Sequence, residues 1–191
     1  MSATPGPLLI LSGPSGAGKS TVIQRLLERG DLPLRLAVSV TTRAPRGQEQ
    51  DGVAYHFWAR PRFDAAVSAG EFLEWAEVFG HCYGTLRSEV EPYRARGTGV
   101  ILVIDVQGAA QVRQKCPDAV TVFLRASSLD EYERRLRKRH TEDEPTIQRR
   151  LAAARGELAH AGEYQHQVIN DELEAAVADL RGIVAGLFAK T

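Results

Sequence analysis

The residues with the clearest chemistry lie near the start of the chain, in the segment GPSGAGKS at positions 13–20. This segment fits the pattern G-x-x-x-x-G-K-[ST], in which glycines let successive backbone N–H groups point inward at an anion. Lys19 can reach the β- and γ-phosphates of a nucleotide, and the Ser20 hydroxyl can ligate Mg²⁺. The segment therefore predicts a triphosphate site. Its expected members are Gly13, Ser15, Gly16, Ala17, Gly18, Lys19, Ser20 and Thr21.

The flanking residues support this prediction. Residues 8–12 (LLILS) are an apolar run typical of a buried strand, and Val22, Leu26 and Arg29 recur at helical spacing. A strand before the loop and a helix after it are the context expected of a P-loop. The alternative is a glycine-rich turn with an exposed lysine. The motif leaves the phosphoryl acceptor open, because GTPases, ATPases, motor domains and small-molecule kinases share it.

Beyond this loop, strand patterns alternate with helix patterns. Strands are expected near 36–40, 99–104, 120–124 and 167–169, and helices near 107–115, 129–139, 146–160 and 172–188. Such alternation indicates an α/β fold, a parallel sheet core flanked by helices. Residues 41–98 interrupt it with short β-like pieces near 55–58, 73–78 and 82–83. We expect a single domain, residues 1–191, with its core at about 1–40, 99–128 and 160–191, an inserted mixed α/β subdomain at about 41–98, and a helical lid at about 129–159.

The bulk composition narrows the class of partner. The chain has 191 residues, of which 43% are hydrophobic and 25% charged, as in ordinary globular proteins. Its 24 basic and 24 acidic residues give no reason to expect nucleic acid or an anionic membrane as partner. No run approaches the ~20 apolar residues of a membrane helix. The two cysteines, Cys82 and Cys116, lack metal-ligand spacing and indicate a reducing compartment instead of a disulfide framework, so a cytoplasmic protein is expected. The oligomeric state is left open.

Arginine pairs favour a kinase among the P-loop classes. Arg43 and Arg46 lie three apart around a proline and could direct two guanidinium forks at one phosphate. Arg135 and Arg139 are four apart and share a helix face, and Arg150 lies on the following helix. The chain also lacks the N-K-x-D sequence expected of a typical GTPase. These features favour a kinase that closes around two small substrates.

A set of further motifs follows in order along the chain: SVTTRAPR at 39–46, Tyr55, EFLEWA at 71–76, YGT at 83–85 and IDVQG at 104–108. With these motifs the sequence resembles the guanylate kinase family of P-loop nucleoside monophosphate kinases, from Leu8 to at least Asp171. The resemblance implies transfer of the γ-phosphoryl group from ATP to GMP, and to dGMP, with Mg²⁺, in purine nucleotide metabolism. It implies small-molecule substrates as the partners.

The resemblance also implies roles for the matching residues on the acceptor side. Family positions that grip the GMP phosphate match Arg43, Arg46, Tyr55 and Tyr83. Glu74 matches the carboxylate that accepts from guanine N1–H and its 2-amino group, with Ser39, Gly84 and Thr85 completing the pocket. Adenine lacks both donors, so it would leave the buried carboxylate without hydrogen-bond partners. A site that binds guanine in this way can disfavour adenine by a factor on the order of 10⁴.

On the donor side, the resemblance assigns the catalytic cations to Lys19, Arg135, Arg139 and Arg150, and places Asn170 near the adenine of ATP. Phosphoryl transfer rests on positioning and cation placement, with little role for a protein base. Ser20 is the expected Mg²⁺ ligand. Asp105 is a candidate for a water-mediated contact with the ion, for the guanine site, or for both.

The sequence departs from the family pattern at three positions. Val103 stands where an aspartate is common, which leaves Asp105 as the only acid at the end of that strand. His140 replaces a glycine after Arg139, and Gln48 stands where a glycine often precedes glutamate. None of the three removes a phosphate ligand, so we interpret them as tuning the site.

Two other functions remain open. One is a guanylate-kinase-like binding module that has lost catalysis and recognises a phosphopeptide; retention of Lys19 and the lid arginines argues against it. The other is a kinase of a phosphorylated sugar, against which Glu74 and Thr85 indicate a base-binding pocket. Taken alone, Glu74 could be an exposed acid between Glu71 and Glu77, and Tyr55 and Tyr83 could be packing residues.

Overall fold

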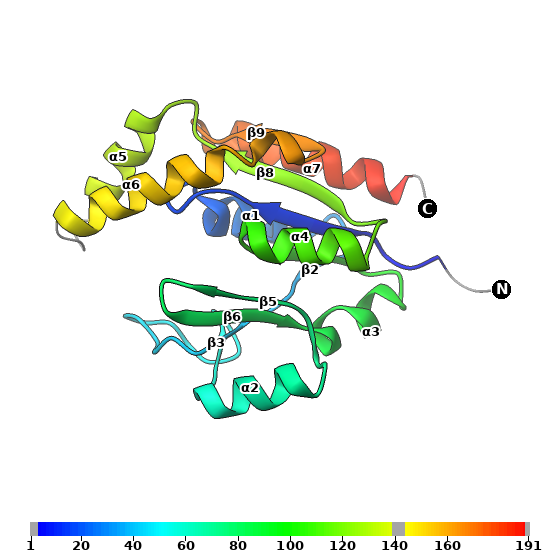
Figure 1. Ribbon diagram of the computed structural model, residues 1–191. Coiled ribbons are helices and arrows are strands. Elements are labelled where there is room, and N and C mark those ends of the chain that lie inside the picture. Colours follow the sequence, from blue (N-terminus) through cyan, green and yellow to red (C-terminus); the bar gives the residue numbers. More distant parts are fainter. Residues whose placement is uncertain (1–3, 139–143, 190–191) are drawn as a thin grey trace. The chain divides into compact units, whose positions relative to one another are not determined.

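The computed structural model describes residues 4–138 and 144–189 of the chain, without the side chain of Lys138. The chain divides into two compact units, each drawn in Figure 1. Unit 1 comprises Met1–Leu8 and Leu34–Ala119, and unit 2 comprises Leu9–Pro33 and Val120–Thr191. Each unit contains parallel strands and helices of its own.

Unit 2 is built on three parallel strands. They are β1 (Leu8–Ser12, of which the first residue belongs to unit 1), β8 (Val120–Arg125) and β9 (His166–Ile169). In this sheet Leu9 faces Val120, and Val122 faces His166. Every residue of β1 is buried. Its unbroken apolar run has the pattern expected of a strand covered on both faces.

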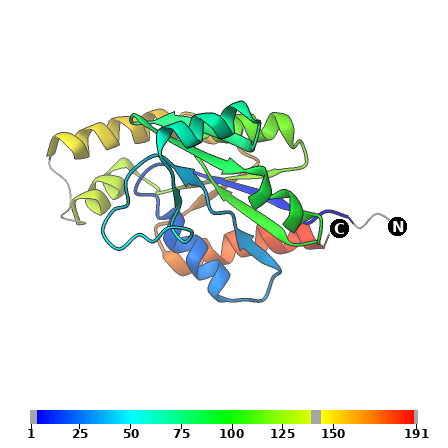
Figure 2. The ribbon, with the colours of Figure 1, turned by 90° about the horizontal axis from the view of Figure 1, so that it is seen from below.

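Helices complete unit 2. They are α1 (Lys19–Glu28), α5 (Leu129–Lys138), α6 (Glu144–Leu158) and α7 (Leu173–Phe188), with a short 3₁₀ turn, η2 (Ala161–Glu163). Helices α1 and α7 pack side by side, as Figure 2 shows in blue and red. Helix α5 buries Tyr132 and Leu136, which lie one turn apart. Their spacing is that of the apolar stripe of an amphipathic helix.

Unit 1 contains a parallel pair and a separate four-stranded sheet. The pair is β2 (Leu34–Leu36) with β7 (Gly99–Val103). The sheet has the order β4-β3-β6-β5, with bounds β3 (Val40–Thr41), β4 (His56–Phe57), β5 (Phe72–Val78) and β6 (His81–Leu86). Strands β5 and β6 form a hairpin whose two turn residues, Phe79 and Gly80, both have positive φ. This is the turn that suits the right-handed twist of paired strands.

Two longer helices accompany this sheet, α2 (Arg60–Ser68) and α4 (Val106–Lys115), besides a one-turn helix α3 (Glu91–Arg94) and the 3₁₀ turn η1 (Arg87–Glu89). In Figure 1, α2 lies on one side of the β5–β6 hairpin and α4 on the other. On the α2 side, Phe63 and Ala66 join Val40, Phe72 and Cys82 in a buried cluster. The two faces of the hairpin therefore have different neighbours.

The α/β class, with parallel strands and flanking helices, is confirmed, as are the strands and helices predicted around the P-loop and after residue 98. The single strand predicted at 36–40 is wrong. After Leu36 the chain leaves its pairing with β7, and Val40 pairs with His56 and Gly84 in the other sheet. No helix in the described ranges is long and apolar enough to cross a membrane. The division into core, insertion and lid stays a prediction.

Candidate nucleotide sites

The predicted P-loop connects β1 to α1 in unit 2. Ala17 N–H donates to the Pro14 carbonyl at 3.0 Å, which closes a tight turn. Gly18 is the N-cap of α1 and has φ 89°, a left-handed conformation that glycine adopts at little cost. A Cβ atom at Gly18 would also lie 2.4 Å from Asn170 Nδ2. The loop therefore presents the N-terminal N–H groups of α1, which lack partners within the helix, as an anion site.

Lys19 and Ser20 occupy the first turn of α1. The Lys19 ammonium donates to the carbonyls of Gly13 and Pro14, so it lies over the loop whose N–H groups would hold phosphates. Ser20 and Thr21 are exposed at the same helix end. Mg²⁺ in nucleotide sites usually keeps several waters and takes one or two protein oxygens besides the phosphates. The exposed Ser20 hydroxyl beside the loop fits that donor set.

Residues from three other segments of unit 2 meet the P-loop. Asn170, which follows β9, donates from Nδ2 to the Ala17 carbonyl at 2.7 Å. Arg135 on α5 donates to the Asn170 carbonyl, and Arg150 on α6 donates from Nη1 to Ser15 Oγ at 3.0 Å. The structure thus gathers three residues that the sequence places far apart. Arg139, with His140, lies outside the described residues.

The candidate acceptor-phosphate site lies in unit 1 around Arg43. The Arg43 side chain is only 7% exposed, and its Nη2 donates to both carboxylate oxygens of Glu49 at 3.0 and 2.9 Å. Burial disfavours its charge, but contacts with Glu49 and Tyr83 raise the pKa of Arg43 above its ordinary value. Arg43 also lies 5.6 Å from the centroid of the Tyr55 ring. The guanidinium is therefore held charged and in a fixed place.

Glu49 is a residue of this site that sequence reasoning did not assign. Besides Arg43, it accepts from the backbone N–H of Arg46 at 2.8 Å. Partial burial opposes the charge of Glu49, but these two donors hold the pKa of its carboxyl below the usual value. The sequence signal that could have indicated this role is the position of Glu49, three residues after Arg46. The side chain of Arg46, by contrast, is exposed.

Two tyrosines complete this region. The rings of Tyr55 and Tyr83 meet edge to face with centroids 5.9 Å apart. They come together because β3 pairs with β4 on one side and with β6 on the other. Burial raises the pKa of Tyr55, which keeps its hydroxyl protonated and able to donate. The structure brings together Arg43, Tyr55 and Tyr83, as predicted; their roles remain a prediction.

Glu74 on β5 lies at the candidate base pocket. Its side chain is 3% exposed, and its Oε1 accepts from Thr85 Oγ1 at 2.7 Å. Ser39 Oγ lies 3.5 Å from the same Thr85 oxygen. Glu71 and Glu77 are exposed. The alternative that Glu74 is one more exposed acid of this strand is therefore wrong.

A β-bulge aims Glu74 away from the α2 side of the sheet. Phe72 packs against Phe63 of α2 with ring centroids 4.5 Å apart, so regular alternation would turn Glu74 toward α2 as well. The register shifts between Phe72 and Glu74, which adds one residue to β5. An extra residue reverses the side on which the following side chain lies. Glu74 accordingly approaches Gly108 on α4, on the opposite side.

The strand opposite also makes room here. A Cβ atom at Gly84 would lie 2.8 Å from the Phe72 ring and 2.9 Å from the Glu74 carbonyl oxygen. Glycine at this position therefore allows β6 to pack closely on the bulged segment of β5.

The surroundings of Glu74 change its ionisation. Burial raises the pKa of its carboxyl, the Thr85 hydroxyl lowers it, and the charge of Asp105 raises it, with a result of about 7. The carboxyl is therefore partly protonated near neutral pH. A ligand that donates hydrogen bonds to the carboxylate would favour the ionised form.

Asp105 is engaged as the N-cap of α4. Its Oδ1 accepts from Gly108 N–H at 2.9 Å, and its Oδ2 accepts from Gln107 Nε2 at 3.2 Å. Val103, at the end of β7, is half-buried. Asp105 thus stabilises the start of α4, while its negative charge raises the pKa of the Glu74 carboxyl.

Comparisons with known proteins point to one family. Residues 6–186 match the family model described as guanylate kinase. A guanylate kinase of Myxococcus xanthus strain DK1622 is 48% identical over 181 residues, covering 94% of this chain and 86% of that protein. One from Synechococcus sp. strain CC9902 is 50% identical over 175 residues, covering 92% of this chain and 93% of that protein.

Among solved structures, the crystal structure of guanylate kinase from Anaplasma phagocytophilum matches with a TM-score of 0.79 and 34% identity, covering 96% of this chain and 86% of that one. The P-loop fold class expected from the sequence is thereby confirmed. A family match across nearly the whole chain, with close relatives of similar length, leads to one conclusion: this chain belongs to the guanylate kinase family.

Proposed function

We propose that this chain transfers the γ-phosphoryl group of ATP to GMP, and to dGMP, giving the nucleoside diphosphate and ADP. The observation that carries the acceptor assignment is the buried carboxylate of Glu74, which accepts one hydrogen bond from the Thr85 hydroxyl. A carboxylate has about four acceptor positions, so it can accept from further donors. The proposed partners of the chain are the small molecules ATP, GMP and dGMP, and its proposed location is the cytoplasm.

Guanine recognition follows from the acceptor character of Glu74. Guanine presents N1–H and its 2-amino group side by side, and both can donate to a carboxylate. Adenine has no donor at N1 and no 2-amino group, so binding AMP would leave a buried charge without partners. Ser39, Gly84 and Thr85 line the same pocket in this proposal. Asp105 is a further candidate contact for the base.

The phosphate of GMP would lie against Arg43, Arg46, Tyr55 and Tyr83. Guanidinium forks and protonated phenol hydroxyls are suitable donors to phosphate oxygens. Arg43 is held rigid by Glu49, and the exposed Arg46 can approach the ligand from solvent. This arrangement would fix the acceptor oxygen for attack on the γ-phosphorus, the positioning on which phosphoryl transfer depends.

ATP would be held by the P-loop, with backbone N–H groups on its phosphates and Asn170 near the adenine. Lys19, Arg135, Arg139 and Arg150 would supply positive charge to the triphosphate and to the transferring phosphoryl group. Ser20 would hold Mg²⁺, with Asp105 as a second candidate acting through a water molecule. The bound ion would supply positive charge against the negative charge that develops on the phosphates during transfer.

One assay tests the proposal: nucleoside diphosphate formation from ATP·Mg²⁺ with GMP, dGMP, AMP, CMP and UMP offered separately. We expect turnover with GMP and dGMP and very little with the others. No turnover of any acceptor would contradict the kinase assignment and favour a binding module. Equal use of AMP and GMP would contradict the guanine pocket.

A further inference from the structure

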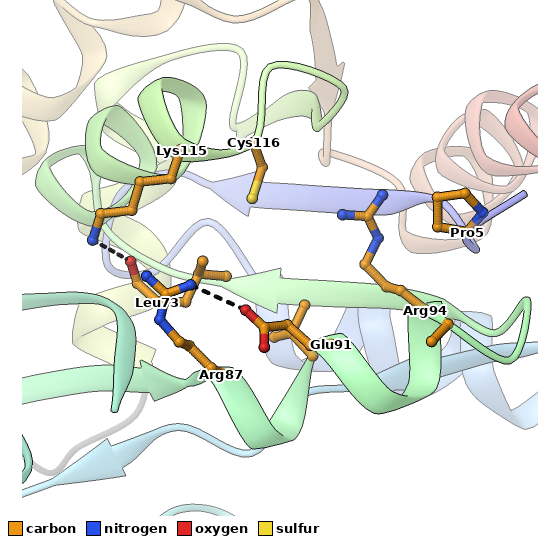
Figure 3. A pocket seen from close by; sticks show the side chains of 9 residues that line it. Pro5, Leu73, Arg87, Glu91, Arg94, Lys115 and Cys116 are labelled. Carbon is orange, nitrogen blue, oxygen red and sulfur yellow. Dashed lines mark hydrogen bonds and ion pairs between the residues drawn. The ribbon is translucent and has the colours of Figure 1, made fainter. Parts of the chain in front are cut away.

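Helix α4 is fastened to β5 at two points. Strand β5 is an edge of the four-stranded sheet, so one side of its backbone needs partners outside the sheet. Gln111 on α4 donates to the Trp75 carbonyl at 2.6 Å and accepts from the Trp75 N–H at 3.3 Å. Lys115, one turn further on, donates to the Leu73 carbonyl at 2.6 Å (Figure 3). These contacts bracket Glu74 and fix the distance between helix and strand.

Gly108 lies on the same face of α4, three residues before Gln111 and seven before Lys115. A Cβ atom at Gly108 would lie 2.3 Å from Glu74 Oε2 and 3.1 Å from its Cδ. The backbone at this position does not require glycine, because Gly108 is not among the positive-φ residues. Glycine also weakens a helix relative to alanine. The close approach of Glu74 therefore explains the glycine better than the helix does.

A methyl group at position 108 would have to displace the carboxyl. The helix is held by Gln111 and Lys115, whereas the carboxyl is the flexible end of a long side chain. The neighbouring cavity of about 310 Å³, lined in part by Leu73, Lys115 and Cys116, does not include Glu74 or Gly108 in its wall (Figure 3). The cavity therefore offers the displaced carboxyl no space, and the Thr85 hydrogen bond would be strained or lost.

We propose that Gly108 is a specificity-determining residue of the acceptor site, because its missing side chain creates the space in which the Glu74 carboxyl is positioned for guanine. The inference rests on the proposed function and extends it to a residue that does not itself bind the base. Gly108 is a positioning residue, since it acts through Glu74. It also connects the start of α4 to the bulge of β5.

The test is the substitution Gly108→Ala in the full chain. GMP binding, measured by isothermal titration without ATP, should weaken by about tenfold to a hundredfold, the range for a disturbed hydrogen bond to a charged group. The KM for GMP should rise in parallel. The KM for ATP should stay unchanged. A purely structural role would instead impair the use of both substrates.

The substitution Glu74→Asp separates positioning from other effects. Aspartate is one methylene shorter, so its carboxyl would withdraw from a methyl group at position 108. In the Glu74→Asp background, Gly108→Ala should therefore change kcat/KM for GMP by less than about threefold. Equal losses in both backgrounds would overturn the inference, because Gly108 would then act independently of Glu74.

Gly182→Ala is the matched control, since Gly182 is an exposed helical glycine of α7 whose added Cβ would meet nothing within 4 Å. It should leave GMP binding and turnover unchanged. Should Gly108→Ala fail to fold, the double variant with Glu74→Ala decides. Recovery of folding would support a clash with Glu74, and failure to recover would overturn it.

The outcomes also separate this inference from the proposed function. A wild-type chain that neither binds nor phosphorylates GMP would overturn both. A wild-type chain that uses GMP, together with a Gly108→Ala variant that binds GMP equally well, would overturn the inference alone.

Discussion

The two units bury polar groups of different kinds. Among the described residues, the buried polar side chains of unit 2 are neutral: Ser12, Thr121 and Asn170. Unit 1 buries the ionisable side chains of Arg43 and Glu74. Around the P-loop, backbone N–H groups and half-exposed cations provide positive charge for a polyanion. Such binding depends little on the exact placement of side chains. The proposed acceptor site instead relies on buried charges, which can discriminate between similar ligands.

The largest expected effect tests the buried carboxylate. Glu74→Ala should lower the preference for GMP over AMP from a factor on the order of 10⁴ to about 10² or less. The variant has no buried carboxylate that adenine would leave without hydrogen-bond partners. ATP affinity should be unchanged. The ratio of kcat/KM for the two acceptors measures this, with Glu77→Ala, an exposed acid on the same strand, as the control. Equal loss of ATP and GMP binding would contradict the separation of the two sites.

Lys19→Ala tests the donor site. Removing a preorganised charge from the transition state should lower kcat by about 10²–10³. GMP affinity should be unaffected, because the residues assigned to GMP belong to unit 1. Arg25→Ala, an exposed cation on the same helix, is the control. A variant with near-normal kcat would mean that Lys19 has been assigned wrongly.

How far the sequence predicts each site follows from how local its signals are. The P-loop is contiguous, and its glycines, lysine and serine identify it before any folding is considered. Glu74 and Thr85 were found only through the family resemblance, because a strand glutamate between two other acids has no local mark of burial. Glu49 was missed, since its role depends on a loop that folds back onto Arg43.

Two features of the fold escaped for a similar reason. No helix range was predicted within residues 41–98, yet α2 and α3 form there, each with a proline in its first turn, where proline is well tolerated. The bulge at Leu73 leaves an ordinary strand pattern and becomes visible only when β5 is paired with β6. Gly108 is likewise explained only by its distance from Glu74. Such features arise from contacts between segments, about which local patterns are silent.

The pH dependence of stability sharpens the contrast between the units. The Glu74 carboxyl has its ordinary pKa of 4.5 in the unfolded chain and a pKa of about 7 in the folded protein. Between these pH values the folded state holds a proton that the unfolded state lacks. Stability therefore falls as pH rises through this range, by about 3 kcal/mol in total. Urea unfolding at pH 5 and pH 8 should show this loss in the wild type.

Glu74→Gln removes the titration and supplies the comparison. Its free energy of unfolding should fall less between pH 5 and pH 8 than that of the wild type, by about 1–3 kcal/mol. GMP, which favours the carboxylate, should bind the wild type more tightly as pH rises toward 7. The variant shows how much of that change comes from the GMP phosphate itself. Parallel pH profiles for both proteins would contradict a raised pKa at Glu74.

The smallest expected effect concerns the support of the P-loop. Asn170→Ala removes the buried amide that donates to the Ala17 carbonyl and should lower the free energy of unfolding by about 1–2 kcal/mol. The KM for ATP should rise a few-fold, because the P-loop loses a hydrogen bond that holds it in place, while GMP affinity stays unchanged. Gln167→Ala, an exposed amide on β9, is the control. If GMP binding weakened as much as ATP binding, the acceptor site would depend on the donor site, and the contrast between the two units would fail.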